Sequence, residues 1–493
     1  MTEDTGASRP RARTLLLEWP LIVAVVAATA LRALAMVTYR PSLLTPDGTS
    51  YLQYAHDLAP TIVRPQGYSI FLRLIGAEHG LVVVPLVQHL LLVAALVPLY
   101  VLMRTRGAAP WVAGLALAPL ALDARQISIE HTVLTEALFL TLVLGSMLLL
   151  TLPRRGTWLT HGAAGLLLGT AAIVRTTGLP LLAVLLIFLL LTRARWTLYV
   201  ALVVGTLVPV ASYAAWYHHS FGTYALTQYD GHFLYGRVAP FADCRGVDDL
   251  TAAERSLCET SDARARRDGT FYVWDPSSPA ARFPGVEGDA VLGSFARKII
   301  LAHPATWAKY AANDTLAHFV PGMSAANEYF CEIRYRFPVD AVTADCFVYV
   351  ANQTMAGEPS TPQYWAPGGE VLQRYQSVAT TPPVLFGLLL VVVLGCSVVA
   401  LRRRRWRGQV EALLFAGVGT GLLVLASATS LYDLRYGYQL VAMLPVAAVL
   451  AITALRAPAS ADRAAPVVGG AADERADDTG PVADDTAPLA RQS

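Results

Sequence analysis

Long apolar stretches recur along almost the whole chain and are separated by short polar turns. A helix needs about 20 mostly apolar residues to cross the hydrocarbon core of a bilayer. Ten stretches approach this length, and we predict them as spans over residues 15–37, 81–103, 108–124, 131–152, 159–174, 178–192, 196–217, 382–401, 409–429 and 436–455. The pattern therefore predicts an all-α polytopic membrane protein with about ten transmembrane helices.

One long polar interval interrupts this pattern between the seventh and eighth predicted spans. It predicts a mixed domain inserted outside the membrane, because Trp, Tyr and Phe residues give it enough apolar surface for a small core. The organisation that follows is a cytoplasmic N-terminus (1–14), a seven-helix module with its first outer loop at 38–80 (15–217), the inserted domain (218–381), three further spans (382–456) and a disordered cytoplasmic tail (457–493).

Composition agrees with the membrane assignment. The 493 residues are 55% hydrophobic and 15% charged, with a mean hydropathy of +0.46, which is atypical of a soluble domain. The formal net charge of +2 gives no indication of nucleic-acid binding. Only two of the basic residues are lysines, Lys298 and Lys309, a bias associated with GC-rich bacterial genomes.

The basic clusters predict the orientation in the membrane. They occur at the N-terminus and after the second, fourth, sixth, eighth and tenth predicted spans: residues 9–13, 104–106, 154–155, 193–195, 402–405 and 456. All lie on one side if the N-terminus is cytoplasmic, as the positive-inside rule requires. We therefore predict a multi-pass protein of the cytoplasmic membrane, with both termini inside and residues 38–80 and 218–381 outside.

Four of the five cysteines lie in the inserted domain, on the oxidising side. An even number of cysteines there indicates disulfides, and local pairing as Cys244–Cys258 and Cys331–Cys346 is the most economical arrangement. Four buried free thiols are the alternative. The same domain contains an amphipathic segment, residues 295–307, which predicts two helices separated before Pro304.

Residues 42–51, at the start of the first outer loop, contain one acid, Asp47. Thr45 can cap a helix, Pro46 fits the first helical position, and Asp47 then lies in the first turn, where an acid is favourable. The same carboxylate, held just above the bilayer, is also well placed to act as a catalytic acid or base. The sequence predicts the helix start and leaves both roles for Asp47 open.

Other outer turns also carry charged residues. Glu130 and His131 lie at the rim of the fourth span and Glu136 lies about one turn inside it, where a carboxylate is costly without a partner. Arg175 occupies the tight turn before the sixth span. Arg435 opens the tenth span and could clamp a phosphate. Structural ion pairs, including Arg125 with a rim acid and Asp433 with Arg435, are the alternative; interfacial tyrosines would then explain Tyr436 and Tyr438.

These residues resemble the GT-C superfamily of membrane glycosyltransferases, in particular bacterial enzymes related to protein O-mannosyltransferases and lipid A aminoarabinose transferase. The similarity covers most of residues 15–455 and rests on four features in order. They are Asp47 followed by Tyr51 and Tyr54; Arg64-Pro65-Gln66-Gly67-Tyr68-Ser69, in which Gln66 and Ser69 depart from the usual prolines; Glu130 with Thr135-Glu136; and Asp433-x-Arg435-Tyr436 with the later Pro445.

The resemblance implies that a sugar moves from a polyprenyl-phosphate-linked donor to a glycan, lipid or protein acceptor on the outer face, with inversion. It implies Asp47 as general base, and Arg435, Tyr436, Arg175 and Arg64 as the residues that bind the donor phosphate and lipid. It places Glu130, His131, Glu136, Tyr51 and Tyr54 near the acceptor or a metal. A divalent ion, Mg²⁺ or Mn²⁺ held by Asp47, Glu130 and His131, stays open, although Asp47 stands alone rather than in an adjacent acidic pair, which weakens it.

A transporter or flippase for a lipid-linked intermediate of the cell envelope is the rival function. Such proteins usually show repeated halves and helices broken near the midplane of the membrane. Neither feature is evident in the sequence, and the polar residues lie at the outer turns. The pattern therefore favours the enzyme.

Overall fold

The computed structural model describes residues 18–153, 156–258, 267–320, 335–341 and 348–457. Each of the ten apolar stretches contains a helix: α2 (Trp19–Thr38), α5 (Val83–Thr105), α6 (Pro110–Leu122), α8 (Glu136–Thr151), α9 (Trp158–Val174), α10 (Leu181–Leu191), α11 (Trp196–Phe221), α18 (Pro383–Arg402), α19 (Val410–Thr429) and α20 (Leu440–Arg456). Short 3₁₀ turns precede three of them, η2 (Thr176–Gly178), η6 (Trp406–Gln409) and η7 (Leu434–Gly437). The protein is an all-α polytopic membrane protein.

The helices differ in their capacity to cross a bilayer. Within the described ranges, six helical stretches are long and apolar enough on their own: α2, α5, α11, α18, η6 with α19, and η7 with α20. Helices α8, α9 and α10 are shorter. Helix α6 qualifies only together with α7 (Ala124–His131), from which it is bent by 49°.

Helix α7 corrects one expectation, since residues 125–130, between the third and fourth predicted spans, were predicted to form an outer turn. The carboxylate of Asp123 accepts a hydrogen bond from the backbone N–H of Gln126 at 2.8 Å and so caps the helix. All eight residues of α7 except Arg125 are buried. The polar composition that indicated a turn belongs instead to a buried helix whose side chains bond to neighbouring elements.

The most extensive helix contact joins α9 and α11 and depends on glycine. A Cβ at Gly165 would lie 2.2 Å from the carbonyl oxygen of Leu202, and one at Gly205 would lie 2.3 Å from that of Gly162. Small residues let two helix backbones approach within the membrane, where close packing has to replace the hydrophobic effect.

The first outer loop folds as predicted around a capped helix. It contains β1 (Tyr39–Arg40), β2 (Leu43–Leu44), α3 (Pro46–Asp57), α4 (Gly67–Leu74) and η1 (Ala77–His79). Thr45 accepts a hydrogen bond from the N–H of Gly48 at 3.2 Å, Pro46 begins α3, and Asp47 lies in its first turn. The helix-start prediction is confirmed.

The long polar interval forms two parts. The first contains α12 (Asp230–Val238), η3 (Ala239–Phe241), α13 (Ala252–Arg255), α14 (Gly269–Trp274), η5 (Pro279–Arg282), α15 (Gly285–Ala302) and α16 (Pro304–Leu316). Its core, which includes Tyr235, Phe295 and Ile299, is separate from that of the bundle. The break between α15 and α16 at Pro304 is as predicted, and so is the disulfide Cys244–Cys258. Cys331 and Cys346 lie outside the described residues.

The second part belongs structurally to the first outer loop. Strand β3 (Tyr349–Val350) pairs antiparallel with β2, and β4 (Gln363–Tyr364) pairs antiparallel with β1. Helix α17 (Ala366–Val378) then packs against α2. These short pairings tie the end of the polar interval to the segment that carries Asp47.

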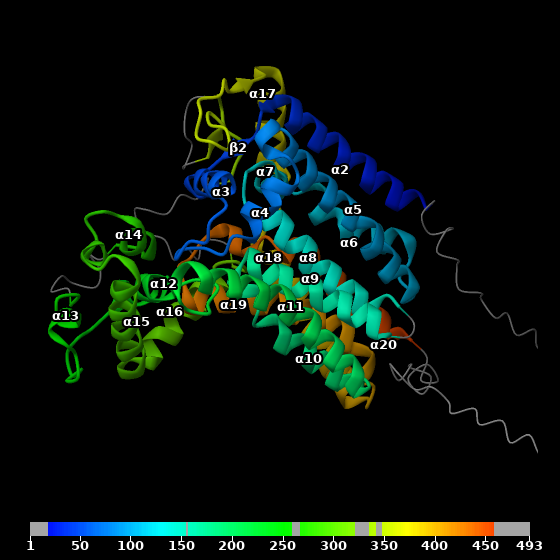
Figure 1. Cartoon of the computed structure of the whole chain (residues 1–493). Coiled ribbons are helices and arrows are strands. Elements are labelled where there is room, and N and C mark those ends of the chain that lie inside the picture. The colour runs from blue at the N-terminus through cyan, green and yellow to red at the C-terminus, as the bar shows by residue number, and fades with distance from the viewer. Residues whose placement is uncertain (1–17, 154–155, 259–266, 321–334, 342–347, 458–493) are drawn as a thin grey trace, which may run out of the picture.

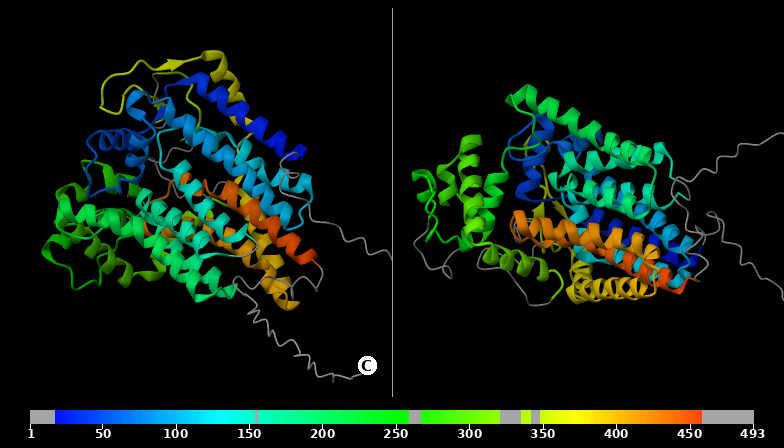
Figure 2. Two further views of the ribbon diagram at one scale, coloured as in Figure 1. Left: turned by 45° about the vertical axis from the view of Figure 1, so that its right-hand side comes forward. Right: turned by 90° about the horizontal axis from the view of Figure 1, so that it is seen from below.

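The views in Figures 1 and 2 show that the helices outside the bundle gather at one end of it. Helices α3 and α12 to α17 lie at this end, whereas the beginning of α2 and the end of α20 lie at the other. The first outer loop and the polar interval therefore share one end of the molecule.

Candidate functional site

Five charged side chains from separate parts of the chain meet beside the first turn of α3. Two are carboxylates, Asp47 and Glu136, and three are guanidiniums, Arg64, Arg175 and Arg435. We call this set the arginine–carboxylate cluster. All five were candidate site residues in the sequence, and the fold brings them into one network.

The two carboxylates share one arginine. Asp47 Oδ1 lies 2.5 Å from Arg64 Nη2, and Asp47 Oδ2 lies 2.7 Å from Arg435 Nη1. Glu136 Oε1 accepts a hydrogen bond from Arg175 Nη1 and lies 3.6 Å from Arg435 Nε. Arg435 therefore connects the Asp47 pair to the Glu136 pair.

Local backbone structure positions Arg435. Asp433 accepts a hydrogen bond from the backbone N–H of Arg435 at 3.1 Å and caps η7, and its other oxygen lies 3.4 Å from Arg435 Nε. Tyr438 directly follows η7, and its hydroxyl donates a hydrogen bond to the backbone carbonyl of Glu136. Glu136 is the first residue of α8, where the helix dipole favours a negative charge.

The cluster is open enough to be reached by a ligand. The side chains of Asp47, Arg64, Arg175 and Arg435 are 15–23% exposed, whereas Glu136 is fully buried. Among the described residues, Arg64 Nη1 and Arg435 Nε are buried without a hydrogen-bond partner. Buried donors without partners are costly, so Arg64 Nη1 is available to an anion that enters the site, whereas Arg435 Nε already faces the carboxylates of Asp433 and Glu136.

The arginines also control the charge state of Asp47. Burial alone would raise its pKa, but the charges of Arg64 and Arg435 and their hydrogen bonds outweigh burial and hold the pKa well below its usual range. The carboxylate is therefore ionised throughout the neutral and mildly acidic range.

Aromatic rings surround the arginines on two sides. The Arg64 guanidinium lies 5.1 Å from the ring centroid of Tyr51 and 5.6 Å from that of Trp274, at the end of α14. Arg175 and Arg435 lie 5.6 and 5.7 Å from the ring of Tyr436. Cation–π contacts of this length hold planar guanidiniums in place. Tyr54 is only partly exposed on α3, and no contact joins its side chain to the cluster within the described residues.

The structure places Glu130 and His131 in a different, sealed network. Glu130 accepts hydrogen bonds from Arg32 at 2.6 and 2.7 Å and lies 2.9 Å from His89 Nδ1. His131 bonds to His89 at 3.1 Å and to the carbonyl of Tyr39 at 2.7 Å. None of these four charged or titratable side chains is more than 4% exposed.

This geometry predicts that Glu130 stabilises the fold. Replacing Glu130 with Gln leaves the Arg32 charge buried without its counter-charge, and we expect the free energy of unfolding to fall by about 3 kcal/mol. Thermal unfolding of the purified protein in detergent measures the loss. Glu78→Gln, at an exposed acid in η1, is the control and should leave the transition unchanged. An unshifted transition in Glu130→Gln would contradict the structural role.

The residues raised as metal ligands do not come together. Across the described ranges, no group of three or more His, Cys, Asp or Glu side chains is arranged to hold a metal ion. Asp47 faces arginines, while Glu130 and His131 face Arg32 and His89. The donor set of Asp47, Glu130 and His131 therefore does not fit a shared ion in this structure.

Three functional neighbours were missed in the sequence. Arg32 and His89 lie inside predicted spans, where a charged or titratable side chain is energetically costly unless it has a buried partner. Their position in the spans could therefore have indicated a buried polar network. Trp274 lies in the polar interval beside Arg64. No local pattern predicts its contact with the first outer loop, because the two segments meet only in the tertiary structure.

The fold and the site together define a polytopic membrane protein with a charged cluster at the end of its bundle that carries the polar interval. No protein-family model matches the sequence, and no curated protein matches it either.

Two solved structures are similar to this chain. One is the Saccharomyces cerevisiae protein O-mannosyltransferase Pmt1–Pmt2 complex bound to the sugar donor, with 16% identity and a TM-score of 0.34 over 52% of this chain. The other is the Archaeoglobus fulgidus oligosaccharyltransferase in the apo form, with 13% identity and a TM-score of 0.40 over 88% of this chain. The chain spans 39% and 50% of their lengths. Because both TM-scores lie below 0.5, we draw the function from the site.

Proposed function

We propose that this chain is an integral membrane glycosyltransferase that moves a sugar from a polyprenyl-phosphate-linked donor to an acceptor on the outer face of the cytoplasmic membrane. The observation that supports this proposal is the arginine–carboxylate cluster. It combines a partly exposed, ionised carboxylate with three arginines, two of which have buried donors without a hydrogen-bond partner among the described residues.

The chemistry of sugar transfer needs both kinds of group. Asp47 takes the proton from an acceptor hydroxyl while the acceptor oxygen forms a bond to the anomeric carbon. The bond from that carbon to the phosphate oxygen breaks, and the electron pair leaves with the polyprenyl phosphate. Displacement from the opposite face inverts the anomeric configuration. Arg435, Arg175 and Arg64 stabilise the negative charge that develops on the leaving phosphate.

Donor binding changes the partners of Asp47 in this proposal. Without a donor, Arg64 and Arg435 keep its pKa low, which makes it a weak base. A donor phosphate competes for the same guanidiniums. As Asp47 loses part of this stabilisation, its pKa rises toward the usual range and it accepts a proton more readily. The site thus gains basicity when the donor is in place.

The surroundings of the cluster suit a sugar. Trp274 is 43% exposed and Tyr51 is nearly buried, and both rings contact the guanidinium of Arg64. An apolar ring face beside charged hydrogen-bonding groups matches the amphipathic surface of a pyranose or furanose. The predicted orientation also supports sugar transfer on the outer face, because the basic clusters place the opposite end of the bundle in the cytoplasm.

Two measurements test the proposal. Purified protein supplied with a radiolabelled polyprenyl-phosphate sugar and cell-envelope extract should transfer the label to an acceptor. Mass spectrometry of the envelope from a deletion strain should reveal one missing sugar, which the wild-type gene restores. An unaltered envelope together with no transfer in vitro would refute the enzyme.

A flippase for a lipid-linked envelope intermediate is the alternative. It would move a labelled polyprenyl-phosphate sugar across liposomes without forming any glycosyl product. Movement of the lipid without product would establish the transporter, whereas product formation without net movement supports the transferase.

A further inference from the structure

A second polar site lies on the other side of η7 from the cluster. It is a cavity of about 60 Å³ between α7, the start of α18, η7 and the start of α20. This volume holds on the order of four water molecules, which is also enough for one phosphate group. In a 3₁₀ helix, residues three positions apart share a face. Leu434 and Gly437 accordingly line the cavity, while Arg435 faces the cluster.

Arg125 is the charged group of this cavity. Within the described part of the chain it forms no ion pair or hydrogen bond, and its Nε is buried without a partner. The one carboxylate in the wall, Asp123, is already bonded to the backbone N–H groups of Gln126 and Thr381 at 2.8 and 2.5 Å. A guanidinium with a buried Nε and no bonded acid among the described residues indicates that an anion completes the site.

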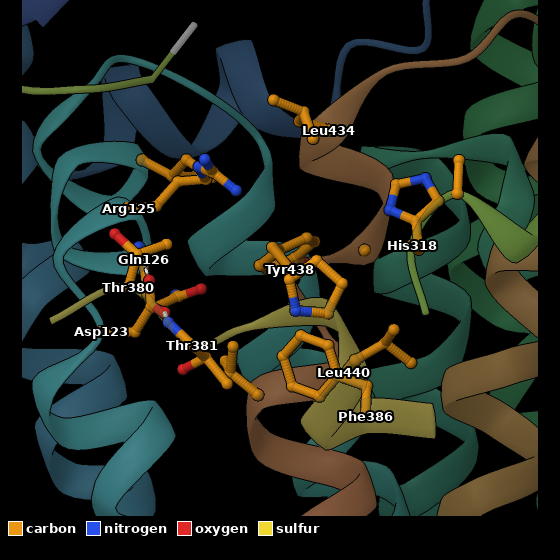
Figure 3. A pocket seen from close by; sticks show the side chains of 15 residues that line it. Asp123, Arg125, Gln126, His318, Thr380, Thr381, Phe386, Leu434, Tyr438 and Leu440 are labelled. Carbon is orange, nitrogen blue, oxygen red and sulfur yellow. Dashed lines mark hydrogen bonds between the residues drawn. The ribbon is translucent and has the colours of Figure 1, made fainter. Parts of the chain in front are cut away.

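The remaining polar wall adds neutral groups. In Figure 3, Arg125 and His318 lie on opposite sides of Tyr438. Burial lowers the pKa of His318 to about 4, so the ring is neutral at pH 7 and can donate one hydrogen bond. Gly437 fits closely against it, because a Cβ there would lie 2.5 Å from His318 Nδ1.

The opposite wall is apolar and continues onto a lipid-facing helix. Pro383 and Phe386 of α18 and Leu440 and Val441 of α20 form it. Only three of the 20 residues of α18 are buried, namely Phe386, Val393 and Ala400. An anion held by Arg125 would therefore have an apolar path beside it along the outside of α18.

We propose that this cavity binds the phosphate of an anionic lipid, with Arg125 as the charged ligand and the lipid chain along α18. The site is distinct from the arginine–carboxylate cluster and does not depend on the sugar-transfer proposal. Free inorganic phosphate has the same headgroup chemistry, and the apolar wall is what favours the lipid.

Photolabelling tests the proposal because it reports where the probe binds. The full-length protein in detergent is labelled with a dodecyl phosphate that carries a diazirine in its chain, and the labelled peptides are mapped. We expect label at the start of α18, which contributes nothing to the cluster. Arg125→Gln should reduce this label at least tenfold, and Arg374→Gln, at an exposed arginine of α17, should leave it unchanged.

A second variant and two competitors keep the test independent of folding. Ala317→Leu fills the cavity without removing the charge and should also reduce the α18 label at least tenfold. Unlabelled dodecyl phosphate should compete at a concentration at least tenfold below that of inorganic phosphate. Equal competition would overturn the lipid assignment in favour of free phosphate. Undiminished label in both variants, or equal labelling by the uncharged dodecanol probe, would overturn the site.

Discussion

Replacing Asp47 with Asn is expected to lower the rate of sugar transfer about a thousandfold while the protein remains folded. A positioned general base contributes on the order of 10²–10⁴ to a rate, and an amide cannot accept the proton of the acceptor hydroxyl. Asn has the same size and its amide oxygen can still accept a hydrogen bond from one of the two arginines, Arg64 or Arg435, which lie 2.5 and 2.7 Å from the two oxygens of Asp47. Transfer of radiolabelled sugar under saturating donor measures kcat.

The matched control is Asp57→Asn, at the exposed last residue of the same helix. It removes one acid from α3 without touching the cluster and should retain full activity. Equal insertion and equal melting of the two variants would exclude a folding defect. If Asp47→Asn keeps wild-type kcat, Asp47 is not the general base, and its role reduces to the helix start and the ion pairs.

The pH dependence follows from the direction of the Asp47 shift. Its pKa in the folded protein is depressed, so the ion pairs with Arg64 and Arg435 contribute stability above the unfolded pKa of 3.8 and lose it only as the pH falls through the lower folded value. These pairs should therefore stay intact from neutral pH down to about pH 4. In the proposed mechanism donor binding raises the pKa of Asp47, so kcat should begin to fall at a higher pH than the stability of the donor-free protein as the pH is lowered.

Replacing Arg435 with Gln is expected to have the second large effect. Arg435 connects Asp47 at 2.7 Å with Glu136 at 3.6 Å and Asp433 at 3.4 Å, so its loss leaves three carboxylates with less compensating charge. The leaving phosphate also loses one of its three cations. Removing one preorganised donor of this kind costs on the order of 10²–10³ in kcat. We expect a loss of that size together with a lower melting temperature.

Arg435→Lys separates charge from geometry. Lysine keeps the charge but cannot reach both carboxylates with a planar fork, so it should restore the melting temperature more than kcat. Arg456→Gln, at the exposed end of α20, the helix that follows η7, is the control and should behave as wild type. A wild-type kcat in Arg435→Gln would remove this arginine from the phosphate site and leave it as an ion-pair residue.

The start of the Asp47 helix was predictable because its determinants are neighbours in sequence. Thr45, Pro46 and Asp47 satisfy the cap, the first turn and the helix dipole without help from the rest of the chain. The Cys244–Cys258 disulfide was predictable for a similar reason, since the two residues are 14 positions apart. Local pairing needs little loop closure.

Helix α7 and the Glu130 network show where local reasoning failed. Residues 125–130 are polar enough to predict a turn, yet they lie in the helix α7 because Arg32, Gln88 and His89 from other helices satisfy its polar groups. Glu130 was grouped with Asp47 for its position at the rim of a span. Only the packing of α2 and α5 against α7 shows that its carboxylate faces inward.

The sequence by itself determined the membrane class, the ten helical segments and the helix that presents Asp47. In lipid each segment must satisfy its own backbone hydrogen bonds, so span and helix coincide and can be recognised from local hydrophobicity. The tertiary structure alone decided which charges meet. Asp47, Glu136, Arg64, Arg175 and Arg435 come from separate turns, and their pairing depends on how the helices pack, because an ion pair forms over a few ångströms regardless of separation along the chain.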